Sequence, residues 1–191
     1  MSRRVLLASA SPRRRMLLEG LGYEVEVRAT NVEEIRGPGE PPAEMVERLA
    51  REKAWAVSVE DEVPVIAADT AVVLTDRLYD EILGKPTDDG QAAHMLRRLS
   101  GNEHIVMTGY CVRLGASERI GVVRTEVWFR SLDDDEIEAY LRTGEAMDKA
   151  GAYGIQGYGG ALVDRISGSY SNVVGLPVAE VIWDLKDLCR W

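Results

Sequence analysis

The most apolar stretch of the chain reads Val65-Ile66-Ala67-Ala68-Asp69-Thr70-Ala71-Val72-Val73. It lies within residues 63–74, where small and β-branched apolar side chains predict a buried strand. A carboxylate is costly to bury without a partner. Asp69 is therefore expected to be paired, to bind a metal, or to lie where the strand ends at a cleft. The alternative is that Asp69 and Thr70 form a turn between two short strands.

Strands and helices alternate on both sides of this stretch. Residues 4–8 predict a short strand, and Ser11 as N-cap with Pro12 as first helical residue predicts a helix that ends at Gly20 or Gly22. Further strands are expected at 23–28, 104–114, 119–130 and 161–166, helices at 42–57, 88–99, 132–142 and 178–188, a hairpin turn at 115–117, and loops at 151–160 and 168–177. This order predicts an α/β fold with a mixed twisted sheet flanked by helices.

Length and composition narrow the class of protein. The 191 residues predict a single domain, 1–191, and the 46% apolar and 29% charged content is that of a globular protein. No apolar run reaches the length of about 18 residues that a membrane span needs, and the run before Ser9 is too short for a secretory signal. The net charge of −9 argues against nucleic acid or an anionic membrane as a partner. With only Cys111 and Cys189, no disulfide framework is expected, and a cytoplasmic location is predicted.

A candidate anion-binding turn follows the first strand and reads Ser9-Ala10-Ser11-Pro12-Arg13-Arg14-Arg15. Its three arginines fall in the first turn of the expected helix, where each cation is unfavourable by a few tenths of a kcal/mol because the helix dipole is positive there. An anion bound by the backbone N–H groups, the serine hydroxyls and the guanidinium groups would explain this arrangement. The alternative is a surface helix with solvated arginines.

Further charged residues are candidates for the same site. Lys53 lies four residues after Leu49 and eight after Met45, so it shares their buried helical stripe and needs a partner. Lys85, in Gly84-Lys85-Pro86, is on its own more typical of an exposed turn. Glu33 and Glu34 offer a second carboxylate for a divalent cation, although on their own they are typical of a solvated pair.

The glycine-rich segment Gly151–Gly160 lets the backbone approach a ligand closely, or simply forms tight turns. It fits neither common phosphate-binding fingerprint. The P-loop needs Ser or Thr after Gly-Lys, where Pro86 stands, and the dinucleotide pattern lacks its last glycine, where Leu162 stands.

Six motifs run in order through nearly the whole chain. They are Leu7-Ala8-Ser9-x-Ser11-Pro12-Arg13-Arg14, Ala68-Asp69-Thr70, Gly84-Lys85-Pro86, Ser100-Gly101-x-x-His104-x-Val106-x-Thr108, Gly144-Glu145-x-x-Asp148-Lys149-Ala150-Gly151-Ala152-Tyr153-Gly154-Ile155-Gln156-Gly157 and Gly168-Ser169-Tyr170-x-Asn172-Val173-Val174-Gly175-Leu176-Pro177. Together they resemble the Maf family of nucleoside triphosphate pyrophosphatases, and within it the branch that acts on dTTP and UTP.

The resemblance implies an ITPase-like fold with two lobes around a central cleft, and a homodimer. It also implies hydrolysis of a nucleoside triphosphate to the monophosphate and pyrophosphate with a divalent cation, Mg²⁺ or Mn²⁺. By this resemblance Asp69 is the catalytic proton acceptor, and Glu34 with Asp69 lies near the metal. Phosphate binding falls to Ser9, Arg13, Arg14, Lys53 and Lys85, and substrate specificity to Arg13, Thr70 and Gln156.

Two points of mechanism follow from the chemistry of these groups. A carboxylate with an ordinary pKa near 3.9 is a weak base at neutral pH. Either the apolar strand makes Asp69 more basic, or a metal acidifies the water and Asp69 only positions it, which we favour. The amide of Gln156 offers a donor and an acceptor that suit the edge of uracil or thymine, whereas a carboxylate there would suit cationic 7-methylguanine.

Two alternative functions stay open at this level. One is a nucleotide-binding regulator of septum formation that does not turn its ligand over. The other is a housecleaning pyrophosphatase directed at 7-methyl-GTP, other purine nucleotides or modified nucleotides. Release of pyrophosphate and a substrate panel separate these functions.

Overall fold

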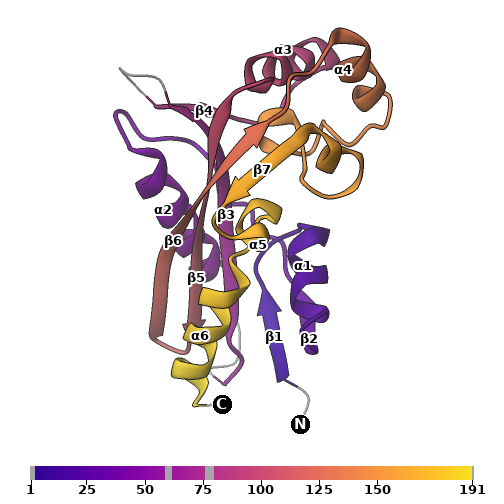
Figure 1. The fold of residues 1–191 in the computed structure, drawn as a ribbon. Helices are drawn as coiled ribbons and strands as arrows, with labels where there is room; N and C mark the ends of the chain where they lie inside the picture. Colours follow the sequence, from indigo (N-terminus) through magenta and orange to yellow (C-terminus); the bar gives the residue numbers. More distant parts are fainter. Residues whose placement is uncertain (1–2, 59–61, 76–79, 191) are drawn as a thin grey trace. The chain divides into compact units, whose positions relative to one another are not determined.

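The computed structural model describes residues 3–58, 62–75 and 80–190, and its helices lie against a mixed sheet (Figure 1). Within those residues the sheet has seven strands in the order β2-β1-β3-β5-β6-β7, with β4 paired to β3. The strands are β1 (Arg3–Leu7), β2 (Tyr23–Val27), β3 (Val65–Thr75), β4 (Asp80–Leu83), β5 (Glu103–Leu114), β6 (Ser117–Phe129) and β7 (Val163–Ser167). β1 is parallel to β2 and β3, whereas β4 and β7 are antiparallel to their partners. The predicted mixed α/β class is confirmed.

The chain forms two compact units. The first comprises Met1–Thr70, Thr108–Val123 and Gly175–Trp191, and the second comprises Ala71–Met107 and Arg124–Val174. The first unit carries α1 (Pro12–Glu19), α2 (Pro42–Trp55) and α6 (Val178–Cys189), and the second carries α3 (Asp89–Leu99), α4 (Asp134–Leu141) and the five-residue α5 (Tyr170–Val174).

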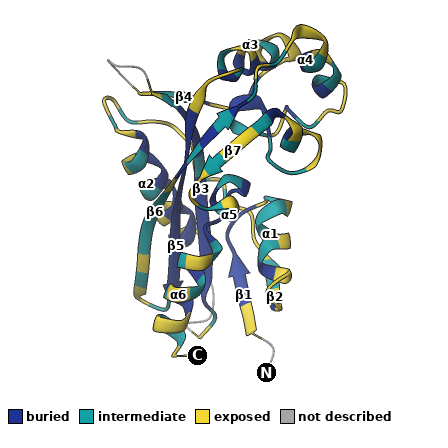
Figure 2. Ribbon diagram, in the orientation of Figure 1, coloured by how far each residue is buried: buried dark blue, intermediate teal, exposed yellow. Residues whose placement is uncertain are grey.

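In the first unit, β3 is buried on both faces from Val65 to Asp69, because its side chains alternate between two faces that are each covered by helices (Figure 2). One face of β3, with Ile66 and Ala68, packs with α1 and α6 residues such as Leu18 and Val181. The other face of β3, with Val65 and Ala67, packs against Ala50 and Ala54 of α2. A strand buried in this way reads as a continuous apolar run, which is the pattern seen in the sequence.

The predicted helix after the Ser-rich turn is confirmed, with Pro12 in its first turn. Ser11 holds the N-cap position, but its side chain forms no capping hydrogen bond. Its backbone N–H donates instead to the Ser9 hydroxyl at 3.3 Å. The start of α1 therefore depends on Ser9 rather than on a Ser11 cap.

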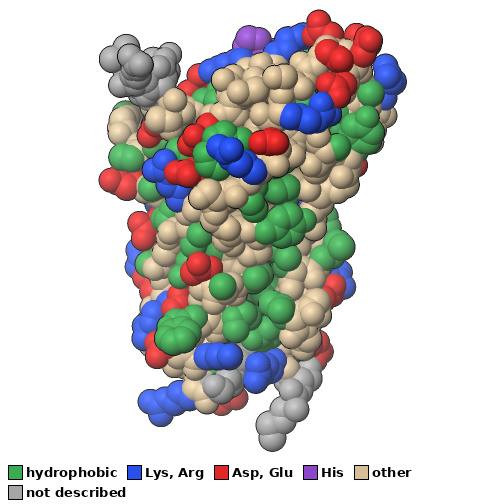
Figure 3. All heavy atoms as spheres, in the orientation of Figure 1, with side chains coloured by type: hydrophobic (Ala, Val, Ile, Leu, Met, Phe, Trp, Pro, Cys, Tyr) green, Lys and Arg blue, Asp and Glu red, His purple; other side chains and the backbone are tan. Residues whose placement is uncertain are grey.

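The second unit has its own core, in which α3 and α4 pack against strand residues including Val106 and Val127. Both helices begin with an aspartate cap. The Asp88 carboxylate accepts from the Gln91 N–H at 2.8 Å, and Asp133 forms a capping box with Glu136. Acidic side chains gather over α4 on the face seen in Figure 3, as its acidic first turn requires.

A buried aromatic cluster in the second unit includes His104. Its ring packs edge-on against Phe129 and Tyr153, and its Nε2 shares a 2.6 Å hydrogen bond with the Tyr153 hydroxyl. Burial lowers the pKa of His104 to about 4, because the charged imidazolium would lose its hydration. His104 is therefore neutral in the folded protein at neutral pH.

The fold corrects three expectations. β3 is one continuous strand through Asp69 and Thr70, so the alternative of a turn there is wrong. Residues 168–177, expected as a loop, contain α5, whose buried Asn172 donates to the Val106 carbonyl and the Thr125 hydroxyl. The sequence reading missed β4, which is only four residues long.

Among the described residues, no helix combines the length and the apolar content that a membrane span requires.

Candidate active site

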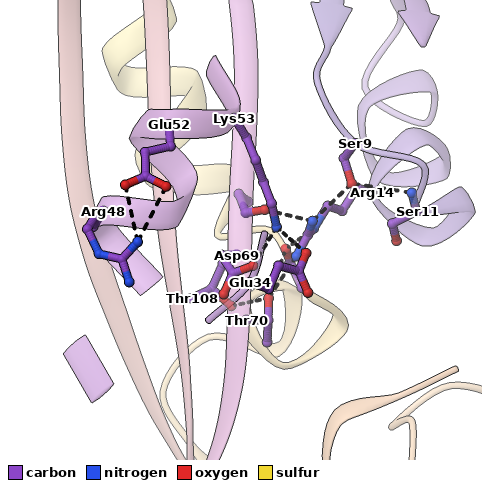
Figure 4. A network of polar contacts seen from close by, with 12 residues as sticks. Ser9, Ser11, Arg14, Glu34, Arg48, Glu52, Lys53, Asp69, Thr70 and Thr108 are labelled. Carbon is purple, nitrogen blue, oxygen red and sulfur yellow. Dashed lines mark hydrogen bonds and ion pairs between the residues drawn. The ribbon is translucent and has the colours of Figure 1, made fainter. Parts of the chain in front are cut away.

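Asp69 lies at the centre of a polar network in the first unit (Figure 4). It is 7% exposed, and its Oδ1 accepts a 2.6 Å hydrogen bond from Lys53 Nζ. Lys53 is equally buried and donates a second bond of 2.5 Å to Glu34 Oε1. The requirement that a buried carboxylate be paired is therefore met by Lys53, which also brings the exposed Glu34 to the same point.

Local periodicity explains how Asp69 and Lys53 meet. Asp69 follows Val65 and Ala67 on the face of β3 that packs against α2. On α2, Lys53 follows Met45 and Leu49 on the buried stripe, as predicted from the sequence. A cation on the buried face of a helix thus lies opposite an anion on the covering face of a strand, and each compensates the cost of burying the other.

The loop that carries Glu34 has no regular structure but is attached to α2 through Arg48. The Arg48 guanidinium donates to both carboxylate oxygens of Glu40, at 2.6 and 2.8 Å, and to the Ile35 carbonyl at 3.0 Å. The hydrogen bonds from Arg48 lower the pKa of Glu40 to about 2. This attachment fixes the residue that follows Glu34 and so limits where the Glu34 carboxylate can lie.

Arg14 occupies the other side of the strand. Its Nε donates to the Gly175 carbonyl at 2.7 Å, and its Nη1 donates to the Ser9 hydroxyl at 2.9 Å and the Ala68 carbonyl at 2.8 Å. Its Nη2 donates to Thr70 Oγ1 at 3.0 Å. These bonds use four of the five N–H groups of the guanidinium.

The electrostatics of the network are balanced. Burial lowers the pKa of Arg14, while the negative charges of Asp69 and Glu34 act in the opposite direction. The two carboxylates face the two cations Lys53 and Arg14, so the four groups together carry no net charge. A polyanionic ligand would therefore need further cations or a metal ion to be bound here.

The carboxylate pair fits a divalent cation of the magnesium class. Glu34 and Asp69 oxygens converge on one nitrogen, and Mg²⁺ is commonly held by one or two carboxylates together with water and substrate phosphates. Within residues 3–58, 62–75 and 80–190, no group of three or more His, Cys, Asp or Glu side chains forms a metal site. The protein would thus supply only part of the coordination shell.

The other predicted site residues are Arg13, which is next to Arg14 in the sequence, and Lys85 and Gln156, which belong to the second unit. Arg13 precedes Arg14 on α1 and is half-buried. Lys85 is exposed in the second unit, where the adjacent Gly84 carbonyl accepts a bond from the N–H of Gly151. This bond attaches the Lys85 turn to the glycine-rich segment that carries Gln156.

The backbone after Gln156 is held by one acidic side chain. The Glu145 carboxylate accepts from the N–H groups of Tyr158 and Gly159, at 3.2 and 3.3 Å. Gly157 has φ +66°, and a Cβ there would lie 2.7 Å from Glu145 Oε1. The positive φ favours glycine at 157, and a side chain there would displace the Glu145 carboxylate from the N–H groups that it binds.

Thr108 and Gly175, for which no role is predicted from the sequence, both belong to this network. The Thr108 and Thr70 hydroxyls share a 3.0 Å hydrogen bond, and Gly175, at φ +120°, presents its carbonyl to Arg14. A polar residue within the apolar run of residues 105–112 was the available signal for Thr108. No local signal identifies a backbone carbonyl 161 residues away as the partner of Arg14.

Comparison with known proteins gives matches over most of the chain. Residues 4–188 match the Maf family model, described as Maf-like protein. The proteins named dTTP/UTP pyrophosphatase from Anaeromyxobacter dehalogenans and Vibrio cholerae are 55% and 51% identical to this chain, over 94% and 93% of it and 91% and 94% of their own lengths. The one from Thermococcus gammatolerans is 50% identical over 96% of both chains.

A solved structure also matches, at a lower level. It is a nucleoside-triphosphatase / dITP/XTP pyrophosphatase from Mycobacterium abscessus, with 18% identity and a TM-score of 0.39, covering 75% of this chain and 95% of that one.

Proposed function

The chain belongs to the Maf family, and on that premise we propose that it is a pyrophosphatase that hydrolyses dTTP and UTP to the monophosphate and pyrophosphate. The observation that carries the proposal is that buried Asp69 of β3 and the exposed loop residue Glu34 both bind the ammonium of buried Lys53 on α2. A purely structural ion pair would need one acid, whereas here a second, exposed carboxylate is brought to the same nitrogen. Two acids beside a buried cation suit a site for a metal-bound polyphosphate.

The reaction needs little covalent help from the protein. Water adds to phosphorus, the phosphoanhydride bond between the α- and β-phosphates breaks, and pyrophosphate leaves. Asp69 accepts a hydrogen bond from the attacking water at a carboxylate oxygen and so positions it, and it takes the proton only as the new bond to phosphorus makes that proton strongly acidic. Lys53 holds that carboxylate in place, and the positive charges of Arg13, Lys53 and Lys85 stabilise the triphosphate.

Glu34 and Asp69 are the residues that would hold the divalent cation, Mg²⁺ or Mn²⁺. When bound, such an ion supplies charge neutralisation and acidification of water. This supports the interpretation that Asp69 positions the water and does not need to be a strong base. The identity of the preferred ion is a matter for titration.

The preference for pyrimidines is assigned to Gln156, with Arg13 and Thr70. A primary amide can donate to a carbonyl of uracil or thymine and accept from its N3–H. Gln156 is half-buried next to Gly157, and the Glu145 bonds limit the motion of the following backbone. The pyrimidine assignment agrees with the names of the curated relatives.

The decisive experiment measures pyrophosphate and orthophosphate separately after incubation with each of the common nucleoside triphosphates, 7-methyl-GTP, and Mg²⁺ or Mn²⁺. We expect pyrophosphate from dTTP and UTP in preference to purine nucleotides. Binding without release of pyrophosphate would favour the regulator of septum formation, and a preference for 7-methyl-GTP or other purine nucleotides would favour the second alternative. Orthophosphate as the first product would contradict cleavage between the α- and β-phosphates.

Two variants test the assigned roles. Asp69→Asn should abolish turnover while nucleotide binding remains measurable, because the amide keeps the size of the side chain but accepts no proton. Gln156→Glu should lower kcat/KM for pyrimidine substrates. Retained turnover in the first variant, or unchanged selectivity in the second, would remove the corresponding residue from the mechanism.

The proposed cellular location is the cytoplasm, and the proposed oligomeric state is a homodimer. A cytoplasmic location agrees with the two free cysteines, of which Cys111 is buried. A homodimer follows from the family resemblance alone, and size-exclusion chromatography with light scattering would test it.

A further inference from the structure

Four hydrogen bonds of Arg14 reach parts of the first unit that are far apart in sequence. They end on Ser9 in the turn before α1, on Ala68 and Thr70 of β3, and on Gly175 before α6. All four acceptors are groups of the protein itself. A guanidinium with four of its five N–H groups used in this way has little capacity left for a phosphate.

One of these bonds takes the place of a backbone hydrogen bond at the edge of β3. Where β1 pairs with β3, the backbone N–H of Leu6 donates to the Pro64 carbonyl at 2.9 Å and that of Ala8 donates to the Ile66 carbonyl at 2.8 Å. The next carbonyl on that edge, two residues on, is Ala68, and it accepts from Arg14 Nη1 at 2.8 Å. The side chain of Arg14 thus continues the ladder at the point where β1 has turned away into α1.

Asp69 follows Ala68 in the chain, and the residue after it, Thr70, accepts another hydrogen bond from Arg14 at its hydroxyl. The Ala68 carbonyl and the Thr70 hydroxyl are both fixed by the same planar group, so the backbone on each side of Asp69 is held. Without such a bond, β3 would have an unpaired edge at this point and more freedom to shift. The carboxylate of Asp69 would then move relative to Lys53.

We infer that Arg14 is a positioning residue, which fixes Asp69 and Thr70 through the backbone of β3, and not a ligand of the triphosphate. The inference rests on the proposed function for its kinetic consequences. It departs from the role that the sequence motif suggested for Arg14, and it leaves Arg13, the adjacent arginine, as the phosphate ligand of this turn.

A matched pair of variants tests the inference, Arg14→Lys against Arg13→Lys. Lysine keeps the charge, but its ammonium cannot reproduce the planar fork that reaches four acceptors. For Arg14→Lys we expect kcat to fall by about 100-fold, the order of loss produced by small misplacements of a catalytic group, with KM within about twofold. For Arg13→Lys we expect the dissociation constant of pyrophosphate, measured by calorimetry with Mg²⁺, to rise by about tenfold.

The direct probe of phosphate binding is inorganic pyrophosphate, which has no base and so reports nothing about base selection. The dissociation constant of pyrophosphate for Arg14→Lys should stay within about twofold of the wild-type value, since a positioning residue makes no phosphate contact that the substitution could remove. Weakened pyrophosphate binding with unchanged kcat would overturn the inference and return Arg14 to the phosphate ligands.

Hydrogen exchange separates the inference from the proposed function. Backbone N–H groups in a peptide covering residues 67–72 should exchange faster in Arg14→Lys than in the wild type and in Arg13→Lys, whether or not any nucleotide is hydrolysed. Unchanged exchange in this peptide would refute the positioning role. An inactive wild type with the expected exchange would instead refute only the proposed function.

A second variant covers the case in which Arg14→Lys fails to fold. Thr70→Val removes one acceptor of Arg14 and keeps the shape of the side chain. We expect a lower kcat, faster exchange in the same peptide and unchanged binding of pyrophosphate. Unchanged exchange or weaker binding of pyrophosphate in this variant would contradict the inference.

Discussion

Replacement of Lys53 by methionine removes the cation that two carboxylates share, while the apolar part of the side chain is kept. Lys53 and Asp69 are both buried, with side chains 7% and 10% exposed, and their charged atoms are 2.6 Å apart. The variant therefore leaves a buried carboxylate without its main partner. Glu34 is affected less, because its side chain is 52% exposed and water can replace the lost bond.

The expected loss of stability is about 3 kcal/mol. At an effective dielectric constant near 20, two unit charges 2.6 Å apart attract by about 6 kcal/mol. The net loss is smaller because the variant avoids the cost of burying the ammonium group, and breaking a buried pair from one side typically costs about 3–5 kcal/mol. For a protein of this length, about 3 kcal/mol lowers Tm by about 10 °C.

Urea denaturation followed by tryptophan fluorescence and circular dichroism gives the free energy of unfolding at pH 7. The matched control is Glu34→Gln, which removes the exposed partner and should cost less than about 1 kcal/mol. The double variant Lys53→Met with Asp69→Asn has no unpaired buried charge, so it should be more stable than the sum of the single losses predicts, by at least about 1.5 kcal/mol.

Two results would refute this reasoning. One is a loss below about 1 kcal/mol in Lys53→Met, which would mean that water already hydrates Asp69 in the folded protein. The other is strict additivity in the double variant, which would show that Lys53 and Asp69 stabilise the protein independently.

Three further predictions concern the rest of the fold. His104 has a pKa of about 4 in the folded protein against 6.5 for the ordinary side chain, so the unfolded state binds more protons between these values and the stability falls as the pH falls through this window. Between pH 7 and pH 5 the wild type should therefore lose about 2 kcal/mol more stability than His104→Phe does. Equal losses in urea titrations of the two proteins would contradict this. A Cβ at Gly109 would lie 2.2 Å from the Val46 carbonyl of α2, so Gly109→Ala should cost about 3 kcal/mol, whereas Gly84→Ala, which meets nothing within 4 Å, should be neutral; similar thermal melts for the two would show that α2 moves away freely. Asp133→Ala removes the capping box of α4 and should lower stability by about 1 kcal/mol, and a Tm equal to that of the wild type would mean that the cap contributes nothing.

Much of the site was predictable because its determinants are local. The continuous apolar run predicted a buried strand in which Asp69 needs a partner, and the helical spacing of residues 42–57 placed Lys53 on the buried stripe. The Ser-rich turn with Pro12 located the start of α1. Each of these features depends on side chains within about one helical turn or a few strand residues, so neighbours in the chain suffice to read it.

The missed elements are those that are too short for a period to be read. β4 has four residues and α5 has five. Their formation depends on distant partners: Arg98 of α3 donates to Glu81 of β4, and Asn172 of α5 donates to the Val106 carbonyl. Pairing between distant segments decided these elements, because their own sequences favour no single structure strongly.

The sequence by itself determined which charged residues fall within an apolar strand or on the apolar stripe of a helix. Only the tertiary structure decided the partners. Asp69 called for a cation, but nothing local distinguished a metal from the ammonium of Lys53, 16 residues earlier. The first turn of α1 called for an anion, yet Arg14 turned to carbonyl and hydroxyl groups of β3 and of the segment before α6. A guanidinium or carboxylate takes the partners that the pairing of strands and helices brings within about 3 Å, and these distances do not exist until the chain has folded.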